Sequence, residues 1–124
     1  MRIVIVDDER PARSELKYLV SLCEPDAQIT EAASSEELLE LMDRESFDVC
    51  FVDINLGGIN GTTVASMIKK QMPDAQIIFA TAFRDYAVKA FEIGAMDYLL
   101  KPCDEDELVS VIEEAMRLTD RREL

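Results

Sequence analysis

The sequence contains no histidine and no tryptophan, and it has only three cysteines, four glycines and four prolines in 124 residues. Without histidine or a CxxC pair, the chain lacks the usual ligands and spacings of a zinc site. The cysteines, Cys23, Cys50 and Cys103, are odd in number and scattered, which gives no disulfide framework and favours the reducing cytoplasm. The sequence also has no apolar stretch of about 20 residues and no cleavable leader, so we expect no membrane segment.

Basic residues are also few: 13 Lys and Arg stand against 26 Asp and Glu, giving a net charge of −13. Because nucleic-acid binding depends largely on Lys and Arg neutralising phosphates, we expect no direct nucleic-acid binding by this chain. The same repulsion argues against anionic membrane surfaces, whereas a concentrated acidic site attracts cations and basic protein faces. The length and a hydrophobic content of 48% predict one folded domain over residues 1–124.

Five apolar, β-branched runs alternate with five segments of helical period. The runs cover residues 2–6, 27–32, 49–52, 77–80 and 96–100. Runs that are apolar throughout predict a sheet covered on both faces, and the regular alternation predicts parallel strands joined by right-handed crossovers. We therefore predict an α/β fold, a doubly wound five-stranded parallel sheet of the flavodoxin-like (βα)5 form.

The helical segments carry start signals and apolar stripes. Pro11 suits the first turn of the first helix, and Ser34 with Glu37 predicts a capping box for the second. A loop holding three glycines is expected over residues 57–61, and the fourth helix is expected over residues 84–93. The predicted buried stripes are Ala12, Leu16, Leu19, Val20 and Cys23 in the first helix, Val64, Met67, Ile68 and Met72 in the third, and Ala87, Ala90 and Phe91 in the fourth.

Polar side chains stand where four of the predicted strands end: Asp7 and Asp8, Asp53, Thr81 and Lys101. Ligands of open α/β sheets bind at this carboxyl edge, so we expect these residues to converge. Two carboxylates about 5 Å apart repel by roughly 3 kcal/mol at an effective dielectric of about 20, so three acids either take up protons or bind a cation. Oxygen ligands without imidazole or thiolate select a hard ion, which predicts Mg²⁺. Each residue alone has an ordinary explanation, such as a loop acid or a helix cap, but their conjunction favours a functional site.

The motifs at these strand ends resemble the receiver family of two-component response regulators. They are VDDE after the first strand, FVDINLGGINGTTVA around the third, IIFATAF at the fourth and DYLLKP at the fifth. The resemblance covers essentially the whole chain and implies the strand order 2-1-3-4-5 for the sheet. The stretch FRDYAVKAFEIGAMDYLLKP is similar, more narrowly, to receivers that precede a LytTR-type DNA-binding domain. Residues 1–124 would then be a receiver domain alone, with the output domain absent from this chain.

The resemblance implies a role for each of the converging residues. Asp53 would accept a phosphoryl group from the phosphohistidine of a sensor histidine kinase. Asp8 and Asp53 would hold Mg²⁺, together with the backbone carbonyl of Asn55 and, directly or through a water, Asp7. Lys101 would pair with a phosphoryl oxygen and supply charge opposite the negative oxygens. The domain would be a signalling module rather than an enzyme, and its output would be transcription control.

A second group of residues would bind the phosphoryl group and report it. The Thr81 hydroxyl and the Ala82 backbone N–H would bind another phosphoryl oxygen. Thr81 would move toward the phosphate, and Tyr98 resembles the family's switch aromatic that turns inward to fill the vacated space; an ordinary half-buried strand tyrosine is the alternative. Phe83, two residues after Thr81, is apolar, and we expect it to exclude water and slow the loss of phosphate.

Apolar residues outside the predicted buried stripes indicate an interaction face. They are Tyr86, Val88 and Ile93 in the fourth helix, and Val109 and Met116 in the fifth. We hypothesise that the face made by the fourth helix, fifth strand and fifth helix forms a homodimer or docking surface after activation. A wider buried stripe is the alternative for the same residues.

Other classes of protein fit the sequence less well. A receiver-like interaction module that never takes phosphate would be expected to lack Asp8, Asp53, Thr81 or Lys101, and the sequence has all four. An aspartate-nucleophile phosphatase needs a second acid two residues after the nucleophile, where this chain has Asn55, and it needs a cap domain. A dinucleotide- or flavin-binding domain is disfavoured because acids, not a GxGxxG motif, follow the first strand.

Overall fold

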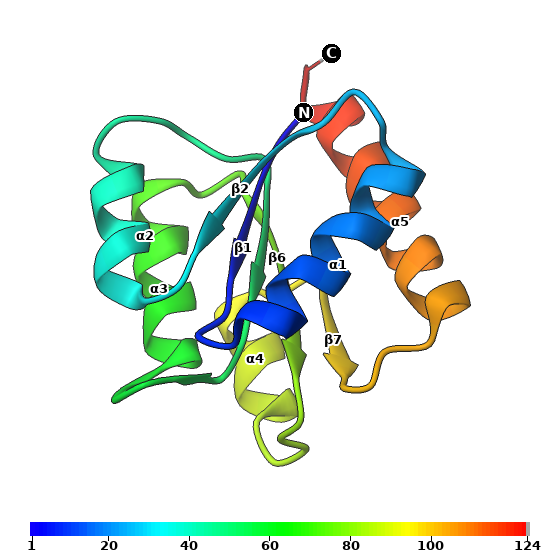
Figure 1. Cartoon of the computed structure of the whole chain (residues 1–124). Helices are drawn as coiled ribbons and strands as arrows, with labels where there is room; N and C mark the ends of the chain where they lie inside the picture. The colour runs from blue at the N-terminus through cyan, green and yellow to red at the C-terminus, as the bar shows by residue number, and fades with distance from the viewer. Residues whose placement is uncertain (124) are drawn as a thin grey trace.

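The computed structural model describes the backbone of residues 1–123 and the side chains of residues 1–120. A five-stranded parallel sheet carries helices on both faces, and two short strands form an antiparallel hairpin outside it (Figure 1). In chain order the elements are β1 (Arg2–Val6), α1 (Arg10–Cys23), β2 (Gln28–Ala32), α2 (Ser35–Met42), β3 (Val49–Val52), β4 (Asn55–Leu56), β5 (Ile59–Asn60), α3 (Gly61–Gln71), β6 (Gln76–Thr81), α4 (Ala87–Ile93), β7 (Asp97–Leu100) and α5 (Glu105–Glu123).

The strands lie across the sheet in the order β2-β1-β3-β6-β7, and every neighbouring pair is parallel. Because β4 and β5 lie outside the sheet, this order is 2-1-3-4-5 when only the strands of the sheet are counted. The predicted fold class and strand order are therefore confirmed. The direction of winding reverses between β1 and β3, which is where an open sheet of this kind forms its ligand site.

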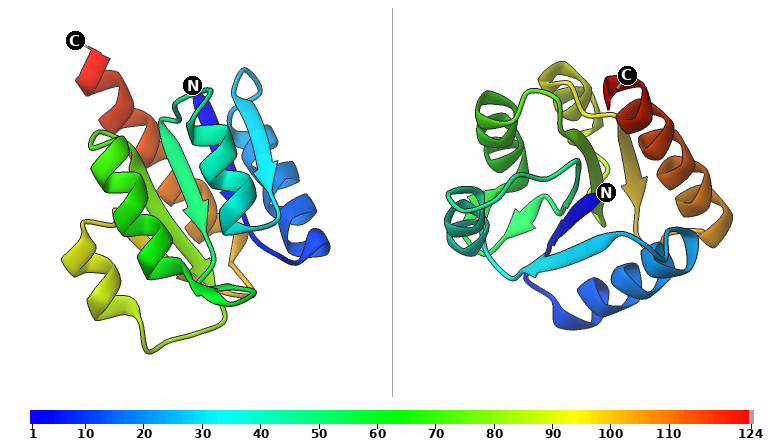
Figure 2. Two further views of the ribbon diagram at one scale, coloured as in Figure 1. Left: turned by 90° about the vertical axis from the view of Figure 1, so that its left-hand side faces the viewer. Right: turned by 90° about the horizontal axis from the view of Figure 1, so that it is seen from above.

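Helices cover both faces of the sheet (Figure 2), and alternating side chains of its strands contribute to two apolar cores, one on each face. In β1, Ile3 and Ile5 pack with residues of α1 and α5, whereas Val4 and Val6 pack with residues of α2, α3 and α4. Both faces of the inner strands β1, β3 and β6 are buried, which explains why these strands are apolar apart from their ends, whereas the edge strand β2 is more exposed. Cys50 belongs to the same core as Val4 and Val6. Burial raises the pKa of its thiol to about 12, as expected for a core residue.

Helices α1 and α2 begin where their start signals indicate. Pro11 lies in the first turn of α1. The Ser34 hydroxyl accepts a hydrogen bond from the Glu37 backbone N–H at 3.1 Å, which confirms the predicted start of α2. Among residues 1–123, no helix combines the length and the apolar character that crossing a bilayer requires.

Helix α4 begins at Ala87, three residues later than the predicted start at residue 84. The residues before it form a loop that is held by hydrogen bonds to β6 and β7. The Phe83 backbone N–H donates to the Thr81 hydroxyl, and the Phe83 carbonyl accepts from the Tyr98 hydroxyl. The Tyr98 contact occupies the Phe83 carbonyl, which a helix starting at residue 84 would need as the acceptor of its first hydrogen bond.

The buried stripes of α3 and α4 differ from the predicted ones. In α4, Ala90 is buried with Tyr86 and Ile93 beside it, whereas Phe91 is 53% exposed. In α3, Met67 is 40% exposed, because the helix turns a neighbouring stripe toward the sheet. The buried residues of α3 are Gly61, Thr62, Val64, Ala65 and Ile68. Periodicity found the helices but placed part of each buried face wrongly.

The region predicted as a glycine-containing loop over residues 57–61 is more ordered than expected. It holds the turn and the second strand of the β4–β5 hairpin, and Gly61 is the first residue of α3 rather than part of a loop. Gly57 and Gly58 have φ values of 62° and 115°, which lie in the region that favours glycine. The two glycines therefore permit the tight turn between strands of two residues each.

Candidate functional site

The carboxyl ends of the sheet strands meet at the lower edge of the molecule in Figure 1. The backbone hydrogen bonds of the sheet continue one residue past the ends of β1, β3 and β7. The Asp7 N–H donates to the Ala32 carbonyl at 3.1 Å, and the Asp53 N–H donates to the Val6 carbonyl at 3.0 Å. The Lys101 N–H donates to the Thr81 carbonyl at 2.8 Å. The polar residues therefore begin where the rigid part of the sheet ends, which fixes their positions.

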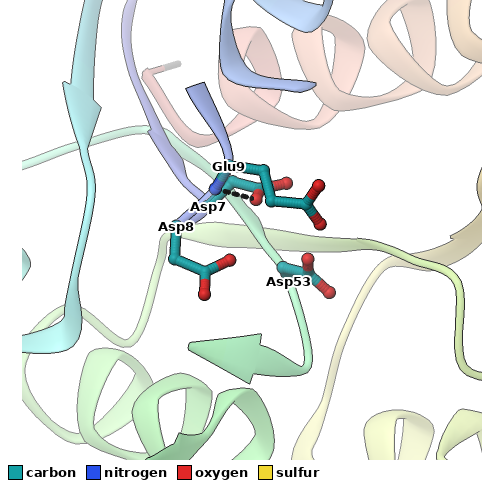
Figure 3. Close-up of side chains that lie close together, drawn as sticks. All are labelled: Asp7, Asp8, Glu9 and Asp53. Atoms are coloured by element: carbon teal, nitrogen blue, oxygen red, sulfur yellow. Dashed lines mark hydrogen bonds between the residues drawn. The ribbon is translucent and has the colours of Figure 1, made fainter. Parts of the chain in front are cut away.

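Four carboxylates gather at this edge (Figure 3). Asp7, Asp8, Glu9 and Asp53 each offer one oxygen, and these oxygens lie within 4.8 Å of one another. Asp7 and Asp53 are buried, at 5% and 6% exposure, while Asp8 and Glu9 are exposed. Like charges this close repel, most strongly for the two that water does not screen. We refer to these four residues as the acid cluster.

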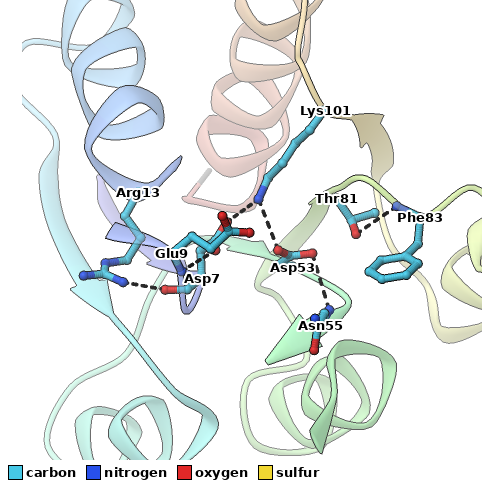
Figure 4. A network of polar contacts seen from close by, with 8 residues as sticks. All are labelled: Asp7, Glu9, Arg13, Asp53, Asn55, Thr81, Phe83 and Lys101. Atoms are coloured by element: carbon cyan, nitrogen blue, oxygen red, sulfur yellow. Dashed lines mark hydrogen bonds and ion pairs between the residues drawn. The ribbon is translucent and has the colours of Figure 1, made fainter. Parts of the chain in front are cut away.

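Lys101 supplies a cation to the acid cluster (Figure 4). Its ammonium group forms ion pairs with the Asp7 carboxylate and, at 3.1 Å, with Asp53 Oδ2. Burial by itself would lower the pKa of Lys101, but the hydrogen bond to Asp7 and the charge of Asp53 outweigh it, so the pKa lies above its ordinary value. Lys101 is therefore charged at neutral pH, and its ion pairs are lost only as the pH rises through that raised pKa.

Backbone groups hold the two buried carboxylates in place. The Glu9 N–H donates to Asp7 Oδ1 at 2.9 Å, and the Asn55 N–H donates to Asp53 Oδ1 at 3.4 Å. Arg13 donates from its guanidinium to the Asp7 carbonyl at 2.7 Å. Asp53 Oδ2 is thus engaged by Lys101 and Oδ1 by the Asn55 N–H, so the carboxylate has a defined orientation.

The acid cluster fits a divalent cation by its chemistry. It offers carboxylate oxygens and no imidazole or thiolate, which is the donor set that Mg²⁺ takes in proteins. Four carboxylates face a single ammonium group there, so a cation would relieve repulsion that Lys101 leaves uncompensated. Of the predicted ligands, Asp7, Asp8 and Asp53 are in the cluster, and Asn55 adjoins it through the hydrogen bond to Asp53.

Thr81 and Tyr98 are connected through the loop that precedes α4. Thr81 is fully buried, and its hydroxyl accepts from the Phe83 N–H at 3.3 Å. Tyr98 is half-buried, packs on Phe79 with ring centroids 5.9 Å apart, and donates its hydroxyl to the Phe83 carbonyl. Burial raises the pKa of Tyr98, so its hydroxyl keeps its proton at neutral pH. Both predicted switch residues therefore bind the two backbone groups of one residue, Phe83.

The structure brings together most of the residues that the sequence singles out, but two participants were missed. Glu9 joins the acid cluster. It directly follows Asp7 and Asp8 in the VDDE motif, and this neighbouring position in the sequence could have indicated that it belongs to the site. The linking role of the Phe83 backbone carries no sequence signal, because it depends on the path of the loop. Ala82 is exposed beside Thr81, and its predicted role as a donor stays a prediction.

Comparisons with known proteins agree with this geometry. The family model for the response regulator receiver domain matches residues 3–113. The chain is 41% identical over 113 residues to the sensory transduction protein LytT of Bacillus subtilis (strain 168), covering 91% of this chain and 47% of LytT. It is 43% identical over 102 residues to the transcriptional regulatory protein LytR of Staphylococcus aureus (strain N315), covering 82% and 42%. The response regulatory domain of protein mrkE from Klebsiella pneumoniae has a TM-score of 0.92 at 29% identity, covering 98% of this chain and 99% of that one.

A doubly wound sheet with acids and a lysine at its carboxyl edge defines a receiver domain, a class of signalling module. The chain belongs to the response regulator receiver family, and its relatives among curated proteins are response regulators named LytT and LytR. The resemblance drawn from the motifs is thereby confirmed. The chain spans about half the length of the curated relatives it matches.

Proposed function

We propose that Asp53 is the phosphoacceptor of this receiver and takes a phosphoryl group from the phosphohistidine of a sensor histidine kinase. The observation that carries the proposal is the contact of Lys101 with Asp7 and Asp53 inside the acid cluster. Phosphoryl transfer needs mainly positioning and charge neutralisation, and this site offers a held carboxylate beside a fixed cation.

In the proposed reaction, an Asp53 carboxylate oxygen attacks phosphorus. An O–P bond forms and the P–N bond to the kinase imidazole breaks, with its electron pair leaving on nitrogen, which then takes a proton from solvent. Asp7, Asp8, Asp53 and the Asn55 carbonyl would hold Mg²⁺, which supplies positive charge to the phosphoryl oxygens when bound. Glu9 lies close enough to contribute through a water.

Three groups of this chain would bind the transferred phosphoryl group. Lys101 already contacts the Asp53 carboxylate, so a small displacement moves its ammonium onto a phosphoryl oxygen. The Thr81 hydroxyl would turn from the Phe83 N–H toward a second oxygen, with the Ala82 N–H beside it. These charge-assisted contacts exist only after phosphorylation, so they stabilise the activated state selectively.

The conformational output would pass through Phe83. Two hydrogen bonds hold the loop before α4: the Phe83 N–H to the Thr81 hydroxyl, and the Tyr98 hydroxyl to the Phe83 carbonyl. The first is lost when Thr81 turns toward the phosphoryl group. Breaking both would free Tyr98 to turn inward and allow α4 to move. Shifting such a two-state element from mostly off to mostly on requires about 5.5 kcal/mol of differential stabilisation.

For the whole protein, we propose that this domain controls a LytTR-type DNA-binding domain and thereby transcription in the cytoplasm. The name of the Staphylococcus aureus relative, a transcriptional regulatory protein, supports the output. The domain would be modified once per molecule by its kinase and would turn over only through slow loss of its own phosphate. The net charge of −13 supports DNA binding by another part of the protein.

The proposal is tested by incubating the protein with acetyl phosphate and Mg²⁺ and measuring intact mass. We expect the mass of one phosphoryl group to appear, and to fail to appear when EDTA removes the divalent cation. An unmodified protein under conditions that phosphorylate a control receiver would leave the alternative, an interaction module that takes no phosphate.

Replacing Phe83 by Ala is expected to shorten the lifetime of the phosphorylated protein several-fold. Phe83 is 46% exposed and lines a cavity with Asn55, whose N–H donates to Asp53, so we propose that its ring flanks the route by which water would reach Asp53. Removing the ring opens this approach, while the backbone groups that bind Thr81 and Tyr98 remain. Loss of phosphate is followed by intact mass after excess acetyl phosphate is removed, and an unaltered half-life would contradict the prediction.

We also propose that the exposed apolar face of α4 pairs with a second copy of the chain after phosphorylation. Val88 and Phe91 lie three residues apart on this helix and are 74% and 53% exposed. Tyr86 and Ile93 pack against the core instead, and Met116 of α5 packs on the other core, so for these residues the buried-stripe alternative holds. The proposed dimer surface is therefore narrower than the sequence predicted.

Val88→Glu is expected to weaken phosphorylation-dependent association at least tenfold, because a symmetric pair would bring two new carboxylates together. Sedimentation velocity with beryllofluoride and Mg²⁺, a stable mimic of the phosphorylated state, gives the measurement. Lys89→Gln, an exposed position on the same helix, makes the same change of one charge unit and is the matched control. A wild-type protein that stays monomeric with the mimic would remove the dimer proposal and leave the phosphoacceptor proposal intact.

A further inference from the structure

A cavity of about 350 Å³ lies between α1, the end of β6 and the start of α5. Its walls are mainly apolar and include Ala12, Leu16, Leu19 and Leu108. Small-molecule sites are typically concave and largely apolar with a few converging polar groups, and their volumes are roughly 300–1,000 Å³. The α1–α5 cavity has these properties and adjoins the acid cluster, because Asp7 belongs to both and Lys101, which also lines the cavity, forms ion pairs with Asp7 and Asp53.

The polar end of the α1–α5 cavity is negative. Asp7 and Glu15 contribute two carboxylates, and Lys101 contributes one ammonium group. That ammonium group forms ion pairs with Asp7 and Asp53, so one cation stands against these two carboxylates and that of Glu15, and the balance at this end is negative. An occupant with an apolar body and a single positive charge would match both the walls and the polar end.

We propose that the α1–α5 cavity binds a small amphiphilic amine, with the apolar part between α1 and α5 and the ammonium group near Asp7 and Glu15. Such binding goes beyond the phosphoacceptor role of the chain. An anion of the same size would meet two carboxylates, and an uncharged analogue would gain only the apolar contacts. The order of affinity is therefore amine, then alcohol, then carboxylic acid.

Binding of the amine and of Mg²⁺ would be antagonistic, and this part rests on the proposed metal site. Asp7 faces the cavity and also contributes to the acid cluster, so two cations would draw on the same carboxylate and repel each other. Linkage requires that each lowers the affinity of the other by the same factor. The amine would thereby act as an inhibitor of phosphorylation that never touches Asp53.

The test uses 2-naphthylmethylamine, 2-naphthylmethanol and 2-naphthoate as a charge series on one ring system. Binding is measured by the naphthalene fluorescence and mapped by amide shifts in ¹H–¹⁵N spectra. We expect the amine to bind about threefold more tightly than the alcohol, the acid to bind least, and the shifts to centre on Leu16 and Leu108. Methylammonium controls for general attraction to a chain with a net charge of −13.

Variants separate the cavity from the rest of the acidic surface. Ala12→Trp fills the cavity and is expected to abolish binding of both the amine and the alcohol, while Ser14→Trp on the exposed side of α1 leaves both unchanged. Glu15→Gln is expected to weaken the amine alone. Should Ala12→Trp fail to melt cooperatively, Leu16→Phe fills the same space with a smaller change.

The cysteines give a second readout in the unmodified chain. Cys103 lines the cavity, Cys23 lies outside it, and Cys50 is buried. The amine is expected to slow the reaction of Cys103 with N-ethylmaleimide at least threefold and to leave Cys23 unaffected.

Three results would overturn the proposal: equal binding of amine and alcohol, equal effects of Ala12→Trp and Ser14→Trp, or no protection of Cys103. Amine binding unaffected by saturating Mg²⁺ would overturn the antagonism alone. Failure of acetyl phosphate to modify Asp53 is a separate outcome, which would remove the phosphoacceptor proposal and leave the cavity standing.

Discussion

Replacing Asp53 by Asn is expected to abolish phosphate incorporation from acetyl phosphate while leaving the fold intact. The amide has no carboxylate oxygen able to form an acyl phosphate, yet it has the same shape and keeps an oxygen for the Asn55 N–H. The loss should be complete within the precision of intact-mass measurement. Asp26→Asn is the matched control, because Asp26 is an exposed acid in the turn between α1 and β2, away from the carboxyl edge of the sheet.

The same variant is expected to be more stable than wild type when Mg²⁺ is absent. Asp53 gains one favourable contact with Lys101 but lies within 4.8 Å of three other carboxylates, and it is 6% exposed, so water screens this repulsion poorly. Removing its charge should raise the free energy of unfolding by about 1 kcal/mol. Adding Mg²⁺ should stabilise wild type more than Asp53→Asn, since only wild type has the full ligand set.

Thermal melts with and without Mg²⁺ measure both effects. A variant that is less stable than wild type without the cation would mean that the Lys101 contact outweighs the repulsion in the acid cluster. A variant that still gains a phosphoryl group would move the acceptor to another carboxylate, and Asp7 and Asp8 would be the first to test.

The sequence predicted the sheet almost completely because its signals are redundant. The inner strands β1, β3 and β6 are buried on both faces and are therefore nearly continuous apolar runs, and the alternation with helical segments determines parallel connections. The edge strand β2, with the sequence QITEA, carries the weakest signal. The site followed from the same fact: polar residues that directly follow such strands must meet at one edge. Asp53 and Lys101 are far apart in the chain, yet each extends the sheet by one backbone hydrogen bond: Asp53 to the Val6 carbonyl of β1, and Lys101 to the Thr81 carbonyl of β6.

Predictions failed where position depends on contacts between elements. Phe91 was assigned to the core and is 53% exposed, because α4 has seven residues and periodicity over so short a segment leaves its rotation undetermined. The start of α4 depends on Tyr98 binding the Phe83 carbonyl, a contact across fifteen residues. The close packing of Gly61 against the Asp53 backbone was also missed. The three glycines of residues 57–61 indicate a turn, but they do not indicate which atoms the start of the next helix will contact.

Replacing Gly61 by Ala is expected to destabilise the protein by about 3 kcal/mol and to lower its melting temperature by roughly 10 °C. Gly61 begins α3, and its N–H donates to the Ile54 carbonyl at 2.6 Å. A Cβ atom at this position would lie 2.0 Å from the Asp53 carbonyl oxygen and 2.8 Å from the Ile54 Cα. Both are backbone atoms of the strand end, so no side-chain rotation relieves the overlap. The better helix propensity of alanine offsets at most about 1 kcal/mol.

Gly58→Ala distinguishes this overlap from the general cost of losing a glycine. A Cβ on Gly58 would have no heavy atom within 4 Å, so its cost comes only from the φ of 115°, about 1–2 kcal/mol. Moving the backbone of Asp53 aside to admit the Gly61→Ala methyl group would also shift its carboxylate relative to Lys101. We therefore expect Gly61→Ala to slow phosphorylation by at least tenfold at temperatures where it is folded, and Gly58→Ala to slow it much less. Equal losses of stability in denaturant unfolding of the two variants would mean that α3 retreats from the strand end at little cost, and that the orientation of Asp53 does not depend on the contact with Gly61.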